Sequence, residues 1–198
     1  MDLDNPPADP IAMLRAWLSL AEEAELPNPT SMTLATIDPD GRPSARVVLL
    51  KHLDDRGIVF HTNRNSRKGR ALTANPRAVL VFHWDVLTRQ VIVEGRVELA
   101  SDEESDAYFA TRPRASQLGA WASAQSEPVS DRLGLDAAYA EVEKRFEGGD
   151  VPRPPHWGGY RLSLDRMEFW LGRPFRLHDR VLYLPDGAGG WSVQRLFP

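Results

Sequence analysis

The sequence predicts a mainly β fold with helices, in which short strands form a closed or nearly closed barrel. Its 14 glycines and 16 prolines are scattered along the chain, which suits short strands joined by tight turns. About eight apolar, β-branched segments recur between turn residues, and closing such strands into a barrel removes exposed edges. A length of 198 residues is enough for one sizeable core, so we expect a single domain over residues 1–198.

The N-terminal half should begin with an amphipathic helix over residues 10–25. Asp9 and Pro10 form a helix-start signal, and apolar residues follow them at helical spacing. Segments rich in β-branched residues then predict strands over residues 31–38, 44–50, 57–62, 78–84 and 89–99. The first three are expected to be consecutive antiparallel neighbours, and a short helix after Asn65 or Ser66 should separate the third from the fourth.

The C-terminal half changes character, because a helical insertion is expected over about residues 101–147. Ser101 is a helix cap followed by acidic first-turn residues, and apolar residues recur at helical spacing through residues 129–147. A turn-rich connector over residues 148–155 then leads to the last predicted strands. These strands cover residues 160–171, 175–184 and 190–196.

The bulk composition excludes several classes of protein. A formal net charge of -4 provides no overall positive field, so neither nucleic acid nor an anionic membrane is an expected partner. The absence of cysteine excludes disulfides, thiolate metal sites and a cysteine nucleophile. The N-terminus is acidic, and no apolar run reaches the roughly 18 residues of a membrane helix, so we expect a cytoplasmic protein.

The most informative polar pattern lies in the predicted strand that contains Arg176, His178 and Arg180. Alternate residues of a strand face the same side, so these three side chains should converge. Cations that converge repel one another unless an anion lies between them, and the planar fork of arginine suits phosphate. The alternative is a solvated strand face with Asp179 as the partner, and spacing alone does not decide between the two.

A second pattern stands at the start of the predicted short helix, where Arg67 and Lys68 follow Ser66. Cations at this end of a helix oppose the helix dipole, and a bound anion would reverse that effect. A solvated basic turn is the commoner explanation of such a pair.

A third pattern is the pair Arg46 and Lys51, which the two-residue period of a strand places on opposite faces. They should therefore contact different groups. The alternative is that both simply flank a buried apolar strand at its solvated ends.

A fourth pattern joins Tyr108 and Arg112, four residues apart on one helix face, with Ser116 following. A phenol, a guanidinium and a hydroxyl could share one phosphate. The alternative is an ordinary surface pair followed by a helix-capping serine.

Other motifs are missing. The histidines show neither HxxxH nor HExxH spacing, so no metal site is expected. Without GxGxxG, a P-loop lysine motif or GxSxG, the chain lacks the signatures of a Rossmann dinucleotide site, a nucleoside triphosphatase and an α/β-hydrolase.

Taken together, several segments resemble the pyridoxamine 5'-phosphate oxidase family in order and spacing, from about Asp9 to Pro198. They are RVVLLKHLDDRGIVFHTNRNSRKG (46–69), RQVIVEG (89–95), YFATRPRASQLGAWASAQS (108–126), PPHWGGYRLSLDRMEFW (154–170) and RLHDR (176–180). The resemblance implies an FMN-binding split barrel that functions as a homodimer, with FMN at the subunit interface. The implied reaction transfers a hydride from C4' of pyridoxine or pyridoxamine 5'-phosphate to the flavin, which dioxygen reoxidises, giving pyridoxal 5'-phosphate and hydrogen peroxide.

The resemblance also implies roles for individual residues. Those implied to bind FMN are Arg46, Lys51, Thr62, Arg67, Lys68, Gln90, Gln125, Ser126, Trp170 and Arg180, with Arg67 and Lys68 near its phosphate. Those implied to bind the substrate are Lys51, Tyr108, Arg112, Ser116, Arg176 and His178. Arg176 and His178 are the implied catalytic residues, because they would orient the pyridine ring against the flavin.

Two departures from the family pattern stand out. Members often carry a longer N-terminal arm that helps to cover the substrate, whereas this chain begins about nine residues before its first predicted helix, so we expect that lid to be missing. His61 stands where the family often has Tyr or Phe.

Two alternative functions stay open. They are a related flavin oxidase of the phenazine-biosynthesis type and a non-catalytic split-barrel protein that binds flavin or haem.

Overall fold

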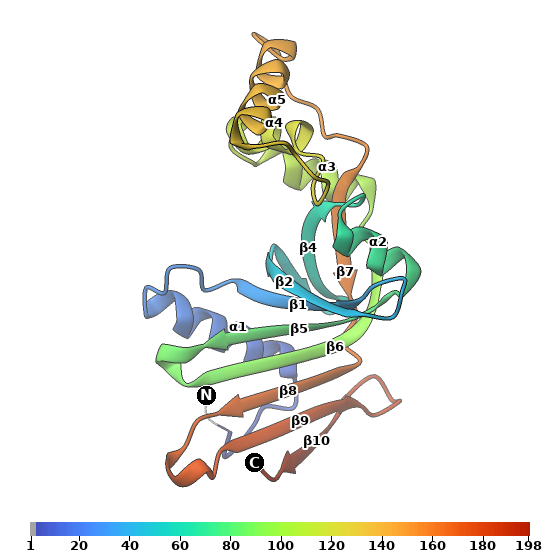
Figure 1. Ribbon diagram of the computed structural model, residues 1–198. Helices are drawn as coiled ribbons and strands as arrows, with labels where there is room; N and C mark the ends of the chain where they lie inside the picture. The colour runs from blue at the N-terminus through green and yellow to red at the C-terminus, as the bar shows by residue number, and fades with distance from the viewer. Residues whose placement is uncertain (1–2) are drawn as a thin grey trace.

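The computed structural model describes residues 3–198 (Figure 1). The strands are β1 Ser31–Ile37, β2 Pro43–Leu49, β3 His52–Asp54, β4 Gly57–Asn63, β5 Arg77–Trp84, β6 Arg89–Leu99, β7 Trp157–Leu162, β8 Arg166–Leu171, β9 Asp179–Pro185 and β10 Trp191–Leu196. The α-helices are α1 Pro10–Glu23, α2 Arg67–Ala74, α3 Asp102–Ala110, α4 Arg114–Ala122 and α5 Arg132–Arg145. Two 3₁₀ turns, η1 Asp85–Leu87 and η2 Pro174–Arg176, complete the order.

All ten strands join in one curled antiparallel sheet, with the order β10-β9-β8-β6-β5-β1-β2 along its main path. Strand β6 is long enough to change partners: residues 89–94 pair with β8, and residues 97–99 pair with β7. Gly95 lies at the change, where a Cβ atom would come within 1.9 Å of the carbonyl oxygen of Ser163. Glycine therefore permits the close backbone approach that splits the sheet into two wings.

The curled sheet confirms the predicted β-rich fold and corrects its strand pairing. Strand β4 pairs with β3 and β7, so the first three predicted strands are not consecutive neighbours, although β1 and β2 do pair. In the described part of the chain, β2 and β4 share no ladder, which leaves the barrel open at that seam. The sequence also undercounted strands, because β3 has three residues and the predicted strand 160–171 divides into β7 and β8.

The main core lies between the sheet and α1, which covers one face of the sheet (Figure 1). Asp9 caps this helix as predicted, since its carboxylate accepts hydrogen bonds from the amides of Ile11 and Ala12. Trp17 is fully buried and makes an edge-on ring contact with Phe169 of β8, with centroids 5.3 Å apart. Helix α1 thereby joins the N-terminal segment to the C-terminal strands.

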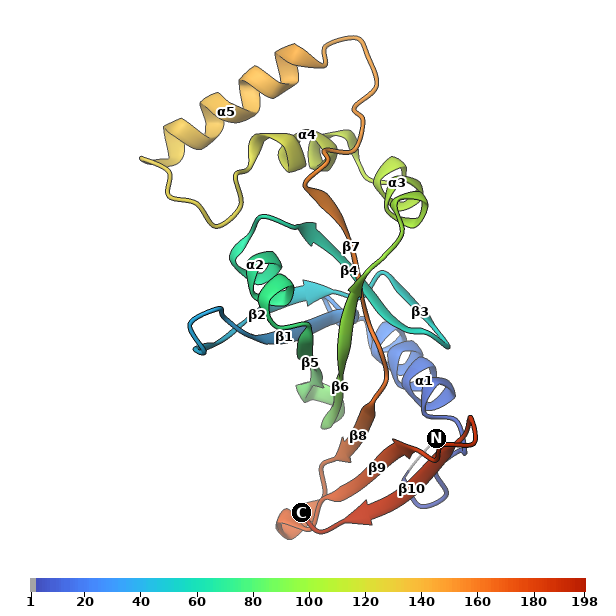
Figure 2. The same cartoon turned by 90° about the vertical axis from the view of Figure 1, so that its right-hand side faces the viewer.

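Helices α3 to α5 gather at the opposite end of the molecule from β8, β9 and β10 (Figure 2). They enclose a small apolar cluster around Phe109, Leu118 and Trp157. Helix α5 forms as predicted, but it contributes no buried residue, and Leu133 is 75% exposed. Among residues 3–198, no helix is long and apolar enough to cross a bilayer.

Candidate active site

A cavity of about 740 Å³ opens between α3 and α4 on one side and β2 and β4 on the other. Many of the candidate site residues line it, although they come from segments far apart in the sequence. They are Lys51, Thr62, Lys68, Tyr108, Arg112, Ser116 and Gln125, which we call the cavity cluster. The fold therefore collects in one place residues that the sequence could associate only by resemblance.

Helix α3 and the turn after it supply one wall of this cavity. Ser101 and Glu104 form the predicted capping box, and α3 then presents Tyr108 before it ends at Ala110. Arg112 lies beyond the helix, so the two do not share a helix face as predicted. The Arg112 guanidinium instead lies over the ring of Trp157, 4.7 Å from its centroid.

Ser116 belongs to the first turn of α4. Pro113 occupies the capping position of that helix, so the alternative role of Ser116 as a cap is wrong. Its side chain is exposed and lines the cavity. Helix α4 itself was not distinguished within the predicted helical stretch.

The cations of the cavity cluster are held by neutral groups. Lys68 Nζ donates to Thr62 Oγ1 at 3.2 Å and to Gln125 Oε1 at 3.0 Å. Burial, and then repulsion by Arg46, lower the pKa of Lys68 to about 8. Lys51 Nζ lies 5.7 Å from the centre of the Tyr108 ring.

Arg112 shares this lack of a counter-charge. Its Nη1 atom is buried and has no hydrogen-bond partner, and burial lowers the pKa of its guanidinium. Within residues 3–198, neither Lys51 nor Lys68 nor Arg112 forms an ion pair with a carboxylate. Lys68 and Arg112 are half-buried, and partial burial of a cation without a counter-charge costs solvation free energy, so the arrangement fits an anionic ligand.

The start of α2 borders the cavity. Arg67 is its first residue, and Arg46 of β2 and Ser126, which follows α4, lie near it. Ser66 caps α2 as predicted, and Ser126 Oγ accepts a hydrogen bond from the Arg67 amide at 3.1 Å. The Arg67 side chain is paired with Asp38, and this hydrogen bond holds the pKa of that carboxyl below its usual range.

Arg46 donates to Thr36 Oγ1 at 2.7 Å and to Ser44 Oγ at 2.7 Å. Strand β2 ends at Leu49, so the prediction that Arg46 and Lys51 occupy opposite faces of one strand is wrong. The two still contact different groups as predicted, because Lys51 lies beside Tyr108.

A second group of candidate residues lies on the β8–β9 wing. Gln90, Trp170 and Arg180 stand side by side on β6, β8 and β9, because Trp170 is in register with both of the others. The imidazole of His178 packs on Trp170, with ring centroids 4.7 Å apart. With Arg176, these residues form what we call the sheet-end cluster: Gln90, Trp170, Arg176, His178 and Arg180.

Arg180 differs from the cavity cations in its partner. Its Nε atom donates to Glu168 Oε1 at 2.8 Å, and Glu168 is buried with 3% exposure. Arg166 donates to the other carboxylate oxygen of Glu168 at 2.9 Å. A buried carboxylate thus fixes Arg180 in place.

The predicted strand face of Arg176, His178 and Arg180 is wrong. Strand β9 begins only at Asp179, and Arg176 lies in η2 with a φ of +63°. Pro174 starts that turn, and positive φ angles at Phe175 and Arg176 are incompatible with a strand.

The alternative prediction was a solvated strand face on which Asp179 is the partner of Arg176, His178 and Arg180. Asp179 pairs with Arg173 at 2.6 Å and with Arg195 at 2.9 Å. His178 Nδ1 accepts from the Arg173 amide at 3.1 Å. The charge of Asp179 is therefore balanced by Arg173 and Arg195, which lie outside the predicted set.

One cavity residue was left out of the predicted site. His61 on β4 lines the cavity beside Thr62, and its ring contacts both Tyr108, with centroids 4.3 Å apart, and Trp157, with centroids 5.2 Å apart. Both ring nitrogens are buried without a partner, and burial followed by Arg112 lowers the pKa of His61 to about 4, so the ring is neutral near pH 7. Its departure from the family pattern, in which Tyr or Phe is common at this position, was the available signal, and it was also the reason for leaving His61 out.

Comparison with protein families identifies two matching models. Residues 20–146 match the model described as pyridoxamine 5'-phosphate oxidase. Residues 157–198 match the model described as the pyridoxine 5'-phosphate oxidase C-terminal dimerisation region.

Curated relatives agree with these matches. The pyridoxine/pyridoxamine 5'-phosphate oxidase of Bordetella petrii is 56% identical over 98% of this chain and 92% of the relative. The protein of the same name from Rubrobacter xylanophilus is 57% identical over 98% of this chain and 89% of the relative.

Two solved structures share the fold. PhzG from Burkholderia lata, in complex with tetrahydrophenazine-1-carboxylic acid, matches with a TM-score of 0.91 and 37% identity, over 98% of this chain and 95% of that chain. A pyridoxamine 5'-phosphate oxidase-related, FMN binding protein from Nostoc punctiforme matches with a TM-score of 0.79 and 17% identity, over 98% of this chain and 100% of that chain.

Proposed function

The chain belongs to the pyridoxamine 5'-phosphate oxidase family, and we propose that it is an FMN-dependent oxidase that forms pyridoxal 5'-phosphate. Its substrates would be pyridoxine and pyridoxamine 5'-phosphates, with dioxygen as the oxidant and hydrogen peroxide as a product. The observation that carries this proposal is the cavity whose cations have no carboxylate partners. Such a cavity suits two phosphorylated ligands, a cofactor and a substrate.

The residues near α2 fit the phosphate of FMN. Burial lowers the pKa of Lys68, and a phosphate beside its ammonium group would raise that pKa towards its usual value. Arg46, Arg67 and Ser126 lie near the same place, where Ser126 Oγ accepts a hydrogen bond from the first amide of α2. We assign these residues, with Thr62 and Gln125, to the cofactor.

The α3 side of the cavity fits the phosphate of the substrate. Arg112, Lys51, Tyr108 and Ser116 offer two cations and two hydroxyls from separate segments. A guanidinium binds phosphate through two parallel hydrogen bonds, which would satisfy the buried Nη1 atom of Arg112. The substrate would thus be held by its phosphate at a fixed distance from its reacting carbon.

FMN supplies the acceptor for the electrons that leave C4' of the substrate. The chain itself contributes binding and orientation. In this proposal Arg176 and His178 lie against the pyridine ring and hold it in line, while the cavity cluster fixes the phosphate. His178 is held by Trp170 and by the Arg173 amide, which limits its rotation.

The proposed site needs two copies of the chain. The cavity cluster and the sheet-end cluster lie at different ends of the molecule, and the cavity lining includes no residue of β8 or β9 (Figure 2). The segment that matches the dimerisation region, residues 157–198, contains most of the sheet-end cluster. Exposed apolar side chains also mark this region, since Phe175 is 94% and Leu177 is 69% exposed. A homodimer in which one chain's sheet end covers its partner's cavity accounts for both facts.

A second candidate is an oxidase of a non-phosphorylated tricyclic acid. The similarity to PhzG favours it, because that protein was solved with tetrahydrophenazine-1-carboxylic acid. The combination of Lys51, Arg112 and Ser116 argues for the first candidate, because a carboxylate would leave part of this cation and hydroxyl set unsatisfied.

Aerobic turnover of pyridoxine 5'-phosphate by the FMN-loaded protein tests the proposal. We expect pyridoxal 5'-phosphate and hydrogen peroxide to form in equal amounts, and pyridoxine without phosphate to react far more slowly. A yellow protein that is inert towards both phosphorylated vitamers but oxidises tetrahydrophenazine-1-carboxylic acid would establish the second candidate. A protein that binds no FMN would contradict both.

A further inference from the structure

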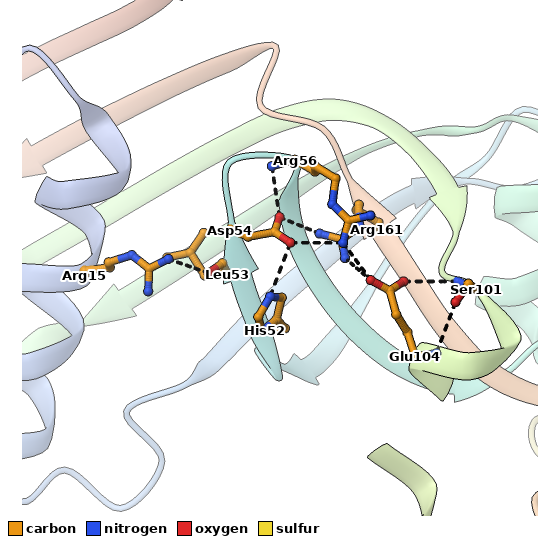
Figure 3. Close-up of polar contacts among 8 residues, drawn as sticks. All are labelled: Arg15, His52, Leu53, Asp54, Arg56, Ser101, Glu104 and Arg161. Carbon is orange, nitrogen blue, oxygen red and sulfur yellow. Dashed lines mark hydrogen bonds and ion pairs between the residues drawn. The ribbon is translucent and has the colours of Figure 1, made fainter. Parts of the chain in front are cut away.

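A compact network of charges joins β3, β7 and α3, outside the residues assigned to either ligand (Figure 3). Arg161 of β7 stands at its centre with 2% exposure. Its Nη1 atom donates to Asp54 Oδ1 at 2.6 Å, and its Nη2 atom donates to Glu104 Oε1 at 2.8 Å. One guanidinium therefore joins carboxylates from two separate elements. We call Asp54, Arg56, Glu104 and Arg161 the Arg161 network.

The network is balanced in charge. Arg56 Nη2 contacts the same carboxylates, Asp54 Oδ2 at 3.2 Å and Glu104 Oε1 at 2.7 Å, but its side chain is 65% exposed. These cations hold the pKa values of both carboxyls below their usual range. The Arg56 hydrogen bond acts most on Glu104. At Asp54 burial raises the pKa, and attraction to Arg161 together with the contacts of Arg56 outweighs it. Arg161 is the buried member of the network, and Arg56 its solvent-screened member.

The two carboxylates belong to the two walls that carry the candidate substrate-phosphate residues. Asp54 ends β3, and β3 begins directly after Lys51. Glu104 lies in the first turn of α3, one helical turn before Tyr108 and on the same side of the helix. Arg161 thus sets the spacing between the segment of Lys51 and the segment of Tyr108 and Arg112.

Other contacts hold α3 on β7 without reaching β3. The Gly159 amide donates to the buried Ser105 Oγ at 3.0 Å. Arg153 donates to Asp102 at 2.9 Å and also pairs with Asp106. These contacts dock the helix, whereas Arg161 links the helix to the strand beside Lys51.

We propose that Arg161 is a positioning residue for the substrate phosphate, which fixes Lys51 on one wall against Tyr108 and Arg112 on the other. This inference rests on the proposed function, because it concerns the same phosphate site. A planar guanidinium binds two carboxylates at once in a fixed geometry, whereas a lysine cannot reproduce that fork. Without it, the carboxylates of Asp54 and Glu104 keep only exposed partners, Arg56 and, at Asp54, His52, and the walls separate.

The test is Arg161→Gln, with KM, kcat and the FMN dissociation constant measured together. We expect KM for pyridoxine 5'-phosphate to rise at least about tenfold, since even a small displacement of the residues that bind the phosphate has large effects. Saturated kcat and the FMN dissociation constant should stay within about threefold, because the residues assigned to the cofactor lie on β2, on β4, at the start of α2 and after α4, outside the Arg161 network. A loss of FMN binding in step with KM would show a merely structural role and overturn the proposal.

Arg56→Gln is the matched control. It removes a guanidinium from the same two carboxylates but leaves Arg161 in place. We expect KM to change less than about threefold, because exposed ion pairs contribute little. An equal rise of KM in both variants would contradict a special role for Arg161.

A double variant separates position from charge. Arg161→Gln leaves the network with one excess negative charge, which could repel a phosphate at a distance. Combining it with Glu104→Gln restores neutrality, and glutamine can replace glutamate in the capping box of α3. If Arg161 acts by position, the double variant keeps the raised KM. Recovery of the wild-type KM would show an effect of charge alone and overturn the proposal.

Two further measurements keep the test decisive. If Arg161→Gln does not fold, Arg161→Lys takes its place, and a wild-type KM in that variant overturns the proposal. If the wild-type protein turns over neither vitamer, the proposed function fails, and binding of inorganic phosphate followed by ³¹P NMR still tests the role of Arg161. Phosphate should then bind at least about tenfold more weakly to the variant, and equal binding would overturn the inference.

Discussion

The cavity cluster and the sheet-end cluster treat positive charge in opposite ways. In the cavity, Lys68 is held by a hydroxyl and an amide, and Arg112 lies on an aromatic ring with a buried nitrogen unsatisfied. At the sheet end, Arg180 is bound to the buried carboxylate of Glu168. One cluster therefore lacks a counter-charge that a ligand can supply, while the other is assembled before any ligand arrives.

This difference indicates how the two clusters divide the work. Unpaired buried cations destabilise the free protein, and that destabilisation is recovered when an anion binds. A group that must orient a ring needs a fixed position more than a free charge. The contrast leads to predictions that separate ligand affinity, reactivity and stability.

The largest effect is expected for Arg176→Ala in the sheet-end cluster. We expect kcat/KM for pyridoxine 5'-phosphate to fall about 100-fold or more, because misorientation of the reacting ring has effects of that size. The FMN dissociation constant should not change, since Arg176 is assigned to the pyridine ring of the substrate and not to FMN. Steady-state kinetics and fluorescence titration of FMN measure the two quantities, and an unchanged kcat/KM would remove Arg176 from the site.

The next effect concerns stability, where the two clusters should respond with opposite signs. Glu168→Gln should destabilise the protein by about 2 kcal/mol, because it leaves Arg166 and Arg180 without their shared carboxylate. Lys68→Met should leave stability unchanged or raise it by about 1 kcal/mol, because it removes a buried cation that has no counter-charge. Urea unfolding without FMN compares the variants, and equal destabilisation of both would contradict the contrast.

A smaller effect is expected at the start of α2. Arg67→Ala should weaken FMN binding about tenfold through the loss of one charge-assisted hydrogen bond to its phosphate. Arg70→Ala is the matched control, because Arg70 lies on the same helix and, like Arg67, pairs with a carboxylate, but it lies further from the start of the helix. Equal dissociation constants for FMN in the two variants would remove Arg67 from the cofactor site.

The smallest effect is a dependence of FMN affinity on pH. The pKa of Lys68 in the free protein is lowered to about 8. As pH rises through that value the ammonium loses its proton, so the FMN dissociation constant should rise by about threefold to tenfold between pH 7.5 and 9. Titrations of FMN across this range should show the rise in the wild type and a flat profile in Lys68→Met. Parallel profiles would show that Lys68 does not face the phosphate.

Local signals in the sequence predicted much of the fold. Asp9 and Ser101 cap helices as expected, and the strands β1, β2, β5 and β6 lie within a residue or two of their predicted bounds. Pairing could not be predicted in the same way, because β6 exchanges partners at Gly95 and β4 pairs with β7, about a hundred residues later. Such contacts depend on distant segments that leave no local pattern.

The candidate site divides along the same line. The family resemblance selected cavity residues that the structure brings together, whereas spacing alone favoured solvated surface positions for most of them. Strand periodicity misplaced Arg176 and His178, because Pro174 and two positive φ angles end the strand pattern there. His61 was left out of the predicted site, and the Arg161 network was not predicted, because their roles depend on burial and on partners far along the chain.

The central claim is that one active site combines the cavity cluster of one chain with the sheet-end cluster of another. Subunit complementation tests it directly, using differently tagged Arg112→Ala and Arg176→Ala chains, each nearly inactive as a homodimer. In the mixed dimer one site carries both substitutions and the other carries neither, so activity should return to about half that of the wild-type dimer. If both clusters served the same chain, each site would carry one substitution, and a mixed dimer as inactive as its parents would contradict the claim.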